Sequence, residues 1–388
     1  MNKSITARAP FFLLWICGAS LRLTVLAVPP VISLMQRDLN LSGTEIGLLS
    51  GIPVVVFGIF AAPGSIVVAR MGVRGALVCG LLVAAGGALL RIGVSNAWQL
   101  YLTSLLMSAG IAVMQPAMAA AVREWMPERS AFGTAVYTNG LILGEIIPVA
   151  TMLPLVLPYF DGSWRPALGV WSFPLIATAV VVAVFAPKSA ASVSTSHAGR
   201  WLPQWNSRLN WRIGLTLGST TSTYFCLNGF LPAFLNGNGR QDLVSAALTA
   251  LNAGQVPASF LLLITADKLQ GKRWPLLALG ALFSSCVVGI MISASAWTVF
   301  WAGLAGFSLA ASLVLALALA PLLCNNPDDV ALTSAAAFAI SYGFAMLISL
   351  LSGVAWDLAG NVNAALIPIL FGSFPVLVAA PTFERKEP

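Results

Sequence analysis

Long apolar runs alternate with short polar segments along the whole chain of 388 residues. An α-helix needs about 20 apolar residues to cross the hydrocarbon core of a bilayer, and twelve runs reach that length. Only 9% of the residues are charged, whereas soluble domains carry about a quarter. The pattern predicts an all-α membrane protein with twelve transmembrane helices. These lie at roughly 11–33, 45–68, 75–94, 97–121, 132–157, 165–186, 213–235, 244–265, 274–294, 297–323, 334–356 and 363–383.

The longest polar segment separates the sixth run from the seventh. It extends from Lys188 to Arg212 and is rich in serine and arginine. We therefore predict an N-terminal six-helix bundle (1–187), a linker (188–212) and a C-terminal six-helix bundle (213–388). The even number of spans places both termini on the same side of the membrane.

Lysine and arginine are distributed unequally between the two sets of loops. Cytoplasmic loops are enriched in these residues, and with the termini inside, fifteen of the twenty lie on the inner side and four on the outer side. The sequence thus predicts cytoplasmic termini and a cytoplasmic linker in an inner-membrane protein. The net charge of +7 follows from this topology and from attraction to anionic lipid, so no nucleic-acid partner is expected. Of the outer set, Arg37, Arg91, Arg165 and Arg240, we interpret the last three as solvated loop charges, with steering of anions to the entrance as the alternative.

Arg22 interrupts the first apolar run, within the stretch Pro10–Met35. A cation near the middle of a membrane helix costs roughly 2.5–3.5 kcal/mol on insertion scales, so it should face a water-filled cavity or an anionic partner. A guanidinium presents a planar fork of donors that suits carboxylate, nitro or cyanate groups. We predict that Arg22 binds an anionic or strongly dipolar substrate. The alternative is a structural arginine bound to helix carbonyls or to an internal acid.

Glu145 is the only acid deep within a predicted span. Burial favours the protonated form of a carboxyl group unless a cation lies nearby. Three roles stay open: Glu145 pairs with Arg22 in the substrate-free cavity, carries a coupling proton, or lies on the lipid-facing or interdomain side as a neutral acid. Proton coupling is the role that we predict.

Other polar residues in the spans are candidates for lining a substrate cavity. Interhelical hydrogen bonding, typically worth about 0.6 kcal/mol and at most near 2, is an equally good explanation for any one of them. Asn252 and Gln255 are three residues apart and share a helix face, which makes them the strongest candidates, followed by Asn228. The predicted substrate-binding set is Arg22, Gln115, Asn139, Asn228, Asn252, Gln255 and Tyr342.

A motif after the second span resembles the loop pattern of the major facilitator superfamily. The stretch SIVVARMGVR keeps Arg70, Gly72 and Arg74 of that pattern, but has Ser65 in place of its glycine and Ala69 in place of its aspartate. After the eighth span, Asp267 and Lys268 restore the acid and base, and SWRPALGVW (Ser163–Trp171) is similar to the Trp-Arg pair at the outer start of the family's sixth span. The resemblance implies two parallel six-helix halves and a cytoplasmic gating latch. The latch residues are Arg70, Arg74, Asp267 and Lys268.

Within this superfamily the chain resembles the cyanate and 2-nitroimidazole transporter group. The resemblance rests on the pair Leu21–Arg22, on AGIAVMQPAMAAAVREWMP in the fourth span, and on LNAGQVPASFLLLITADKL around the eighth. It implies transport of small anionic or polar planar compounds, cyanate-like, nitroimidazole-like or small carboxylates. It also implies a site near the midplane between the halves, in a protein that works as a monomer.

These observations predict a secondary active transporter that is not an enzyme. The phosphate-binding pattern of ATPases is absent, and one membrane glutamate, scattered cysteines and no membrane histidine do not build a catalytic or metal centre. We expect proton-coupled symport by alternating access, with a small-molecule substrate, protons and the lipid bilayer as partners and no cofactor. A channel fits two similar halves with proline-broken helices less well than a carrier does.

The alternative is a proton-coupled drug or metabolite exporter of the same fold. Gly140, Gly144 and Pro148 partly match the glycine-rich fifth span of antiporter members of the family. That match favours export, and it places Glu145 at the packed interface between the halves.

Overall fold

The computed structural model describes residues 3–187, 207–293, 295–324 and 327–383, and within these ranges it contains helices and no β-strand. The predicted all-α fold is confirmed. Most of the predicted linker, 188–206, lies outside the described residues. The longer helices are α1 (Lys3–Leu26), α3 (Gly43–Leu90), α4 (Ala97–Trp125), α5 (Ser130–Thr151), α8 (Ser172–Phe185), α9 (Arg208–Gly237), α10 (Val244–Ala253), α11 (Gln255–Leu269), α12 (Arg273–Ile292), α13 (Trp297–Leu317) and α15 (Pro327–Ala359). The shorter helices are α2 (Ile32–Leu39), α6 (Leu157–Tyr159), α7 (Trp164–Gly169), α14 (Leu319–Leu323), α16 (Leu366–Ser373) and α17 (Pro375–Ala379).

Ten segments of the described chain are long and apolar enough to cross a membrane, judged by length and composition. The predicted seventh and eighth spans are helical too, but they are not among the ten. The seventh falls on α9, whose many serine, threonine and asparagine residues lower its hydropathy. The eighth falls on two shorter helices, α10 and α11, which are separated by the single residue Gly254.

The chain forms two compact units that divide α3 between them. The first unit is Met1–Leu39 with Val56–Ser196, and the second is Asn40–Val55 with His197–Pro388. Within α3 the backbone of Gly72 has a φ of 70°, which only glycine adopts without strain, and this kink separates two helical spans. The first part of α3 therefore packs with helices that follow the polar linker.

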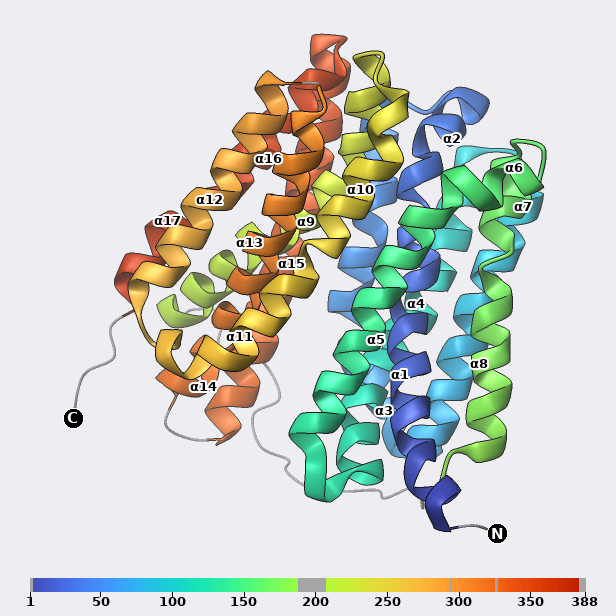
Figure 1. Ribbon diagram of the computed structural model, residues 1–388, viewed down its shortest axis with the longest axis vertical. Helices are drawn as coiled ribbons and strands as arrows, with labels where there is room; N and C mark the ends of the chain where they lie inside the picture. The colour runs from blue at the N-terminus through green and yellow to red at the C-terminus, as the bar shows by residue number, and fades with distance from the viewer. Residues whose placement is uncertain (1–2, 188–206, 294, 325–326, 384–388) are drawn as a thin grey trace. The chain divides into compact units, whose positions relative to one another are not determined.

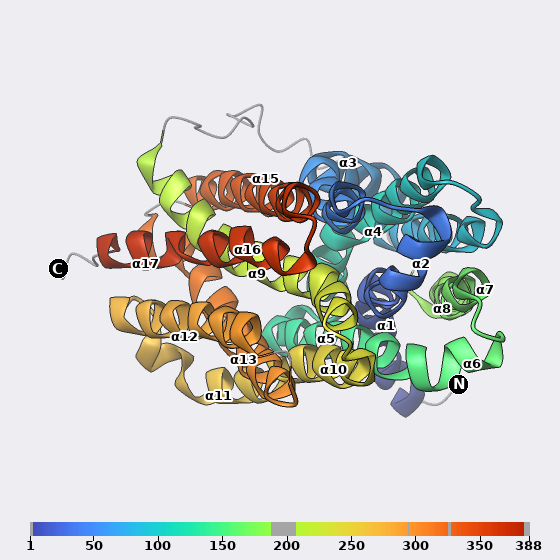
Figure 2. The same ribbon diagram turned by 90° about the horizontal axis from the view of Figure 1, so that it is seen from above.

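Helix α1 lies at the centre of the first unit, in contact with α4, α5 and α8 (Figures 1 and 2). Helix α5 approaches it backbone to backbone: a Cβ atom at Gly140 or Gly144 would overlap the carbonyl oxygen of Trp15 or Ala19. The spacing Gly140-x-x-x-Gly144 is the small-residue pattern that lets membrane helices approach closely. Since the contacts advance in the same order along both helices, α1 and α5 run parallel.

Helix α9 has the corresponding place in the second unit, in contact with α10, α13, α15, α16 and α17 (Figure 2). Its hydroxyl groups are buried without loss of hydrogen bonds, because they return to carbonyls of their own helix or reach a neighbour. Thr216 Oγ1 donates to the Arg212 carbonyl at 2.8 Å, and Thr220 Oγ1 and Ser312 Oγ of α13 lie 3.2 Å apart. A polar helix is thus stable in the interior of this unit.

The first part of α3 belongs to the second unit and packs closely against α15 at its glycine residues. Ser349 Oγ of α15 donates to the Gly47 carbonyl at 2.7 Å, and a Cβ atom at Gly47 would overlap the Ser349 carbonyl. At the N-terminus of α3, the Asp357 carboxylate accepts hydrogen bonds from the backbone N–H groups of Gly43 (2.6 Å) and Thr44 (2.8 Å). The carboxylate satisfies helix N–H groups that have no partner within α3.

Candidate functional site

Arg22 of α1 and Glu145 of α5 form a largely buried ion pair in the first unit. The distance between Arg22 Nε and Glu145 Oε1 is 3.2 Å, and the side chains are 18% and 3% exposed. The guanidinium carbon also lies 5.7 Å from the centre of the Phe57 ring, within the range of a cation–π contact. Of the three roles left open for Glu145, the structure contains the pairing with Arg22.

The close packing of α1 on α5 positions this pair. Glu145 follows Gly144, which lies against the backbone of Ala19, about one turn before Arg22. Removing one partner of a buried pair leaves a buried charge uncompensated and typically costs 3–5 kcal/mol. The two side chains are therefore expected to depend on each other for stability.

A second polar cluster lies in the second unit and joins α9 to α10. Tyr224 OH donates to Asn252 Oδ1 at 2.7 Å, Asn252 Nδ2 donates to Asn228 Oδ1 at 3.0 Å, and Asn228 Nδ2 donates to the Tyr224 carbonyl at 3.0 Å. Asn228 and Asn252 are buried. We call these three residues the amide cluster. It presents neutral donors and acceptors that are already fixed by one another.

Gln255 follows Asn252 of this cluster by three residues and belongs to the next helix, α11. Helix α10 ends at Ala253, and Gln255, which is half-buried, begins α11 directly after Gly254. Gly254 itself has helical dihedral angles (φ −57°, ψ −21°), so the shared helix face of Asn252 and Gln255 stays a prediction.

The other predicted substrate-binding residues are dispersed. Gln115 is half-buried in α4. Asn139 of α5 is exposed, and its Oδ1 accepts a hydrogen bond from Trp15 Nε1 at 3.0 Å. Tyr342 of α15 is half-buried and stacks on Phe338, with ring centres 5.9 Å apart. Asn139 thus makes an interhelical hydrogen bond, which was the alternative to substrate contact for these polar residues.

The predicted gating residues have different environments. Arg74 donates to the carbonyls of Ala183 and Ala186 at the C-terminal end of α8, where a cation interacts favourably with the helix dipole. Arg70 and Lys268 are exposed, whereas the side chain of Asp267, in α11, lies outside the described residues. Arg74 therefore has a structural contact within the first unit.

Arg91 differs from the sequence expectation. It was interpreted as a solvated loop charge, and that was wrong: the residue is 2% exposed, and it donates to the Thr24 carbonyl and to Ser104 Oγ. The reason is that the turn Arg91–Gly93 continues α3 and points the side chain inward. The sequence did indicate burial of this side chain, because Arg91 falls inside the third apolar run, 75–94.

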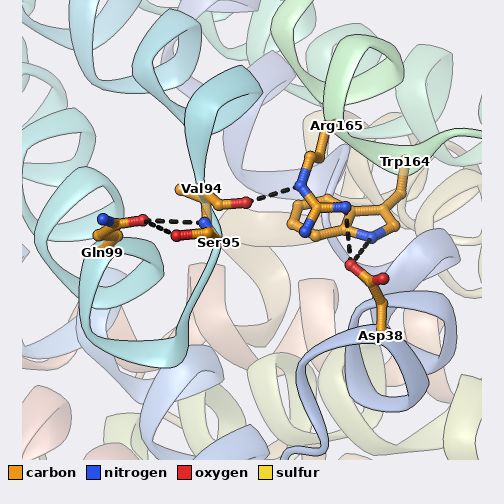
Figure 3. A network of polar contacts seen from close by, with 6 residues as sticks. All are labelled: Asp38, Val94, Ser95, Gln99, Trp164 and Arg165. Carbon is orange, nitrogen blue, oxygen red and sulfur yellow. Dashed lines mark hydrogen bonds and ion pairs between the residues drawn. The ribbon is translucent and has the colours of Figure 1, made fainter.

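Arg165 is also bound rather than freely solvated, in a network at one end of the first unit (Figure 3). Its Nη1 lies 2.7 Å from Asp38 Oδ2, its Nε donates to the Val94 carbonyl at 2.6 Å, and Trp164 Nε1 donates to the same Asp38 oxygen at 3.1 Å. The Trp-Arg pair noted in the sequence therefore ties α7 to α2 and to the turn before α4.

Comparison with known proteins agrees with this architecture. A family model described as Major Facilitator Superfamily matches residues 14–350. A 2-nitroimidazole transporter of Escherichia coli (strain K12) is 25% identical over 354 residues, 91% of this chain and 89% of the relative. The cyanate transport protein CynX of the same organism is 26% identical over 351 residues, 89% of each chain.

Solved structures give the same result for the fold. The nucleoside transporter NupG has a TM-score of 0.74 over 99% of this chain and 98% of that chain, at 13% identity. A bacterial homologue of the lysosomal transporter Spinster has a TM-score of 0.71 over 99% and 98%, also at 13% identity. The chain is a multi-pass membrane transporter and not an enzyme, and it belongs to the Major Facilitator Superfamily.

Proposed function

We propose that this chain is a proton-coupled symporter that takes up a small anionic or polar planar solute, with Arg22 as the substrate anchor. The observation that carries the proposal is the ion pair between Arg22 and the buried Glu145. The names of two relatives, a 2-nitroimidazole transporter and a cyanate transport protein, support the solute class. Nitro, cyanate and carboxylate groups are acceptors that suit the planar fork of a guanidinium.

The same pair supplies a route for proton coupling. An anion that binds Arg22 competes with Glu145 Oε1 for the N–H groups of the guanidinium. Glu145 then loses the cation that favours its charged form, and burial favours the protonated acid. Binding of the anion therefore promotes binding of a proton, and a monovalent anion crosses the membrane without net charge.

The amide cluster is the proposed neutral part of the recognition surface. The Asn228 side chain has two N–H donors, of which one bonds the Tyr224 carbonyl, and Asn252 positions both Tyr224 and Asn228. Gln115, Asn139, Gln255 and Tyr342 remain candidates for substrate contact. The proposed alternating-access cycle includes the latch of Arg70, Arg74, Asp267 and Lys268, with both termini in the cytoplasm and the two bundles divided at 188–212.

Export by the same fold is less well supported than uptake. The glycine pattern of the fifth span, Gly140 and Gly144, was the sequence feature that favoured export. In the structure these glycines bring α5 onto α1 within the first unit, so packing accounts for them without an antiporter function.

A binding experiment tests the anchor directly. The melting temperature of the detergent-purified protein is measured with cyanate, nitrate, small carboxylates, 2-nitroimidazole and cationic drugs, because a ligand that binds the folded state raises it by mass action. We expect stabilisation by an anion or a nitroimidazole, and its loss in Arg22→Ala and Arg22→Lys. Arg129→Ala removes an exposed arginine and serves as the charge control.

Two outcomes would contradict the proposal. Stabilisation by cations alone would favour the exporter, and an anion response that is unchanged in both Arg22 variants would assign Arg22 a structural role.

A further inference from the structure

Helix α1 ends soon after Arg22, and one of its carbonyls is left for another partner. Pro29 and Pro30 have no N–H groups to continue the helix. The Ala27 N–H donates to the Leu23 carbonyl at 3.2 Å, and the Val28 N–H turns back to the Val25 carbonyl at 3.3 Å. The Thr24 carbonyl lies between these and accepts from Arg91 Nη1 at 3.3 Å.

Arg91 is a buried cation for which the described part of the chain supplies no carboxylate. Its other contact is neutral as well, from Nη2 to Ser104 Oγ of α4 at 2.9 Å. The ion pairs found in the described ranges involve Arg22, Arg165 and Arg240. A guanidinium stays charged in proteins, and a buried charge without a counter-ion is strongly unfavourable.

Two more polar atoms around this contact are unsatisfied. Arg91 Nε and Thr24 Oγ1 are buried, and neither has a hydrogen-bond partner among the described residues. Thr24 is 1% exposed and Arg91 is 2% exposed, so bulk water does not serve them. A guanidinium N–H and a hydroxyl, beside the Ser104 hydroxyl, are all groups that donate to an anion.

We propose that Arg91, Thr24 and Ser104 form a binding site for a small inorganic anion of the size of chloride. The anion neutralises Arg91 and accepts hydrogen bonds from Arg91 Nε and the Thr24 hydroxyl. Thr24 is two residues beyond Arg22, and side chains at that spacing do not share a helix face. The site is therefore separate from the Arg22–Glu145 pair, and its occupancy stabilises the end of the helix that carries Arg22.

The test uses the full-length protein in detergent, without transport substrate. The melting temperature is followed while sodium gluconate is replaced by sodium chloride at constant ionic strength. We expect a saturable rise of a few degrees, because the anion binds the folded state. Bromide should give the same rise and, in crystals, an anomalous difference peak beside Arg91.

Three variants make the result specific. Thr24→Val removes the hydroxyl and keeps the backbone carbonyl, and should raise the half-saturating chloride concentration about tenfold or more. Thr178→Val removes another buried hydroxyl of the same unit, one bonded to Ser20, and should respond like the unaltered protein. Arg22→Ala should also keep the response, which distinguishes this site from the proposed substrate anchor.

The proposal fails if chloride and gluconate give the same melting temperature. A water molecule, and not an anion, would then be the partner of these polar groups. It fails equally if Thr24→Val responds to chloride as the unaltered protein does. If Thr24→Val does not fold, Ser104→Ala replaces it, with the same expected loss of affinity.

Discussion

The two central helices, α1 and α9, pack against their long neighbours in different ways. Helix α5 meets α1 backbone to backbone at Gly140 and Gly144. Helix α15 meets α9 through side chains: a Cβ atom at Gly218 would lie 3.0 Å from the Phe344 ring. At Gly144 the neighbouring backbone cannot yield to an added methyl group, whereas at Gly218 the neighbouring ring can rotate.

The polar groups at these two contacts differ as well. The α1–α5 contact contains the Arg22–Glu145 ion pair, and the α9–α15 contact contains a hydrogen bond of 3.0 Å from Ser341 Oγ to Thr221 Oγ1. The charged pair thus lies beside a backbone-to-backbone contact, and the neutral hydroxyl pair lies beside contacts made by side chains. A charged pair requires accurate positioning. In a medium of low dielectric constant, moving two opposite charges slightly apart loses far more interaction energy than moving two hydroxyl groups apart.

The largest effect is expected from breaking the ion pair. Arg22→Ala should destabilise the protein by about 3–5 kcal/mol, since it leaves Glu145 buried without a cation. Ser341→Ala, at the neutral contact, should cost about 0.6 kcal/mol and at most near 2. Melting temperatures in one detergent compare the two variants.

A double variant sharpens this prediction. In Arg22→Ala with Glu145→Ala, no charge is left unpaired, so part of the lost stability should return. Equal melting temperatures for Arg22→Ala and Ser341→Ala would show that the pair contributes no more than a hydroxyl contact.

A smaller effect is expected from adding one methyl group at each contact. Gly144→Ala forces a Cβ atom onto the Ala19 carbonyl and should cost about 1–3 kcal/mol, with weaker substrate-induced stabilisation because Glu145 moves relative to Arg22. Gly218→Ala meets only the Phe344 ring, which can rotate, and should cost less. If Gly218→Ala is the more damaging variant in a thermal melt, the contrast between rigid and adjustable contacts is wrong.

The smallest effect concerns an exposed ion pair, Arg240–Asp242 in the second unit, which is the counterpart of the buried pair. The hydrogen bond from Arg240 lowers the pKa of Asp242 below its usual value. A lowered pKa contributes stability above the unfolded-state pKa, and this is lost as the pH falls through the folded-state pKa. In the unaltered protein the melting temperature should therefore fall slightly as the pH is lowered, and Asp242→Asn should abolish this fall. At neutral pH the melting temperature of Asp242→Asn should be almost unchanged. A large change at neutral pH would contradict this.

Much of the architecture follows from local patterns in the sequence. Each apolar run needs only length and composition to predict a membrane helix, and the motif around Arg70, Gly72 and Arg74 marks the turn in α3, where Gly72 has its positive φ. Arg22 was recognisable as a candidate because a cation in an apolar run requires compensation wherever the helix packs.

Partners across helices could not be predicted from the same patterns. Nothing local to Glu145 distinguishes pairing with Arg22 from the other two roles, because the choice depends on how α5 packs on α1. Arg91 stands at the border between a predicted span and a loop, and one turn of helix decides whether its side chain is solvated or buried. The contacts of Asn252 with Tyr224 and Asn228 likewise depend on how α10 packs on α9.

The central claim is that anion binding at Arg22 drives proton binding at Glu145. The most direct test is uptake of the identified solute into proteoliposomes with an imposed pH gradient, acidic outside, for the unaltered protein and Glu145→Gln. The unaltered protein should concentrate the solute and lose that ability when a protonophore is added. Glu145→Gln should only equilibrate it, with no pH dependence. Concentrative, pH-dependent uptake by Glu145→Gln would contradict the account.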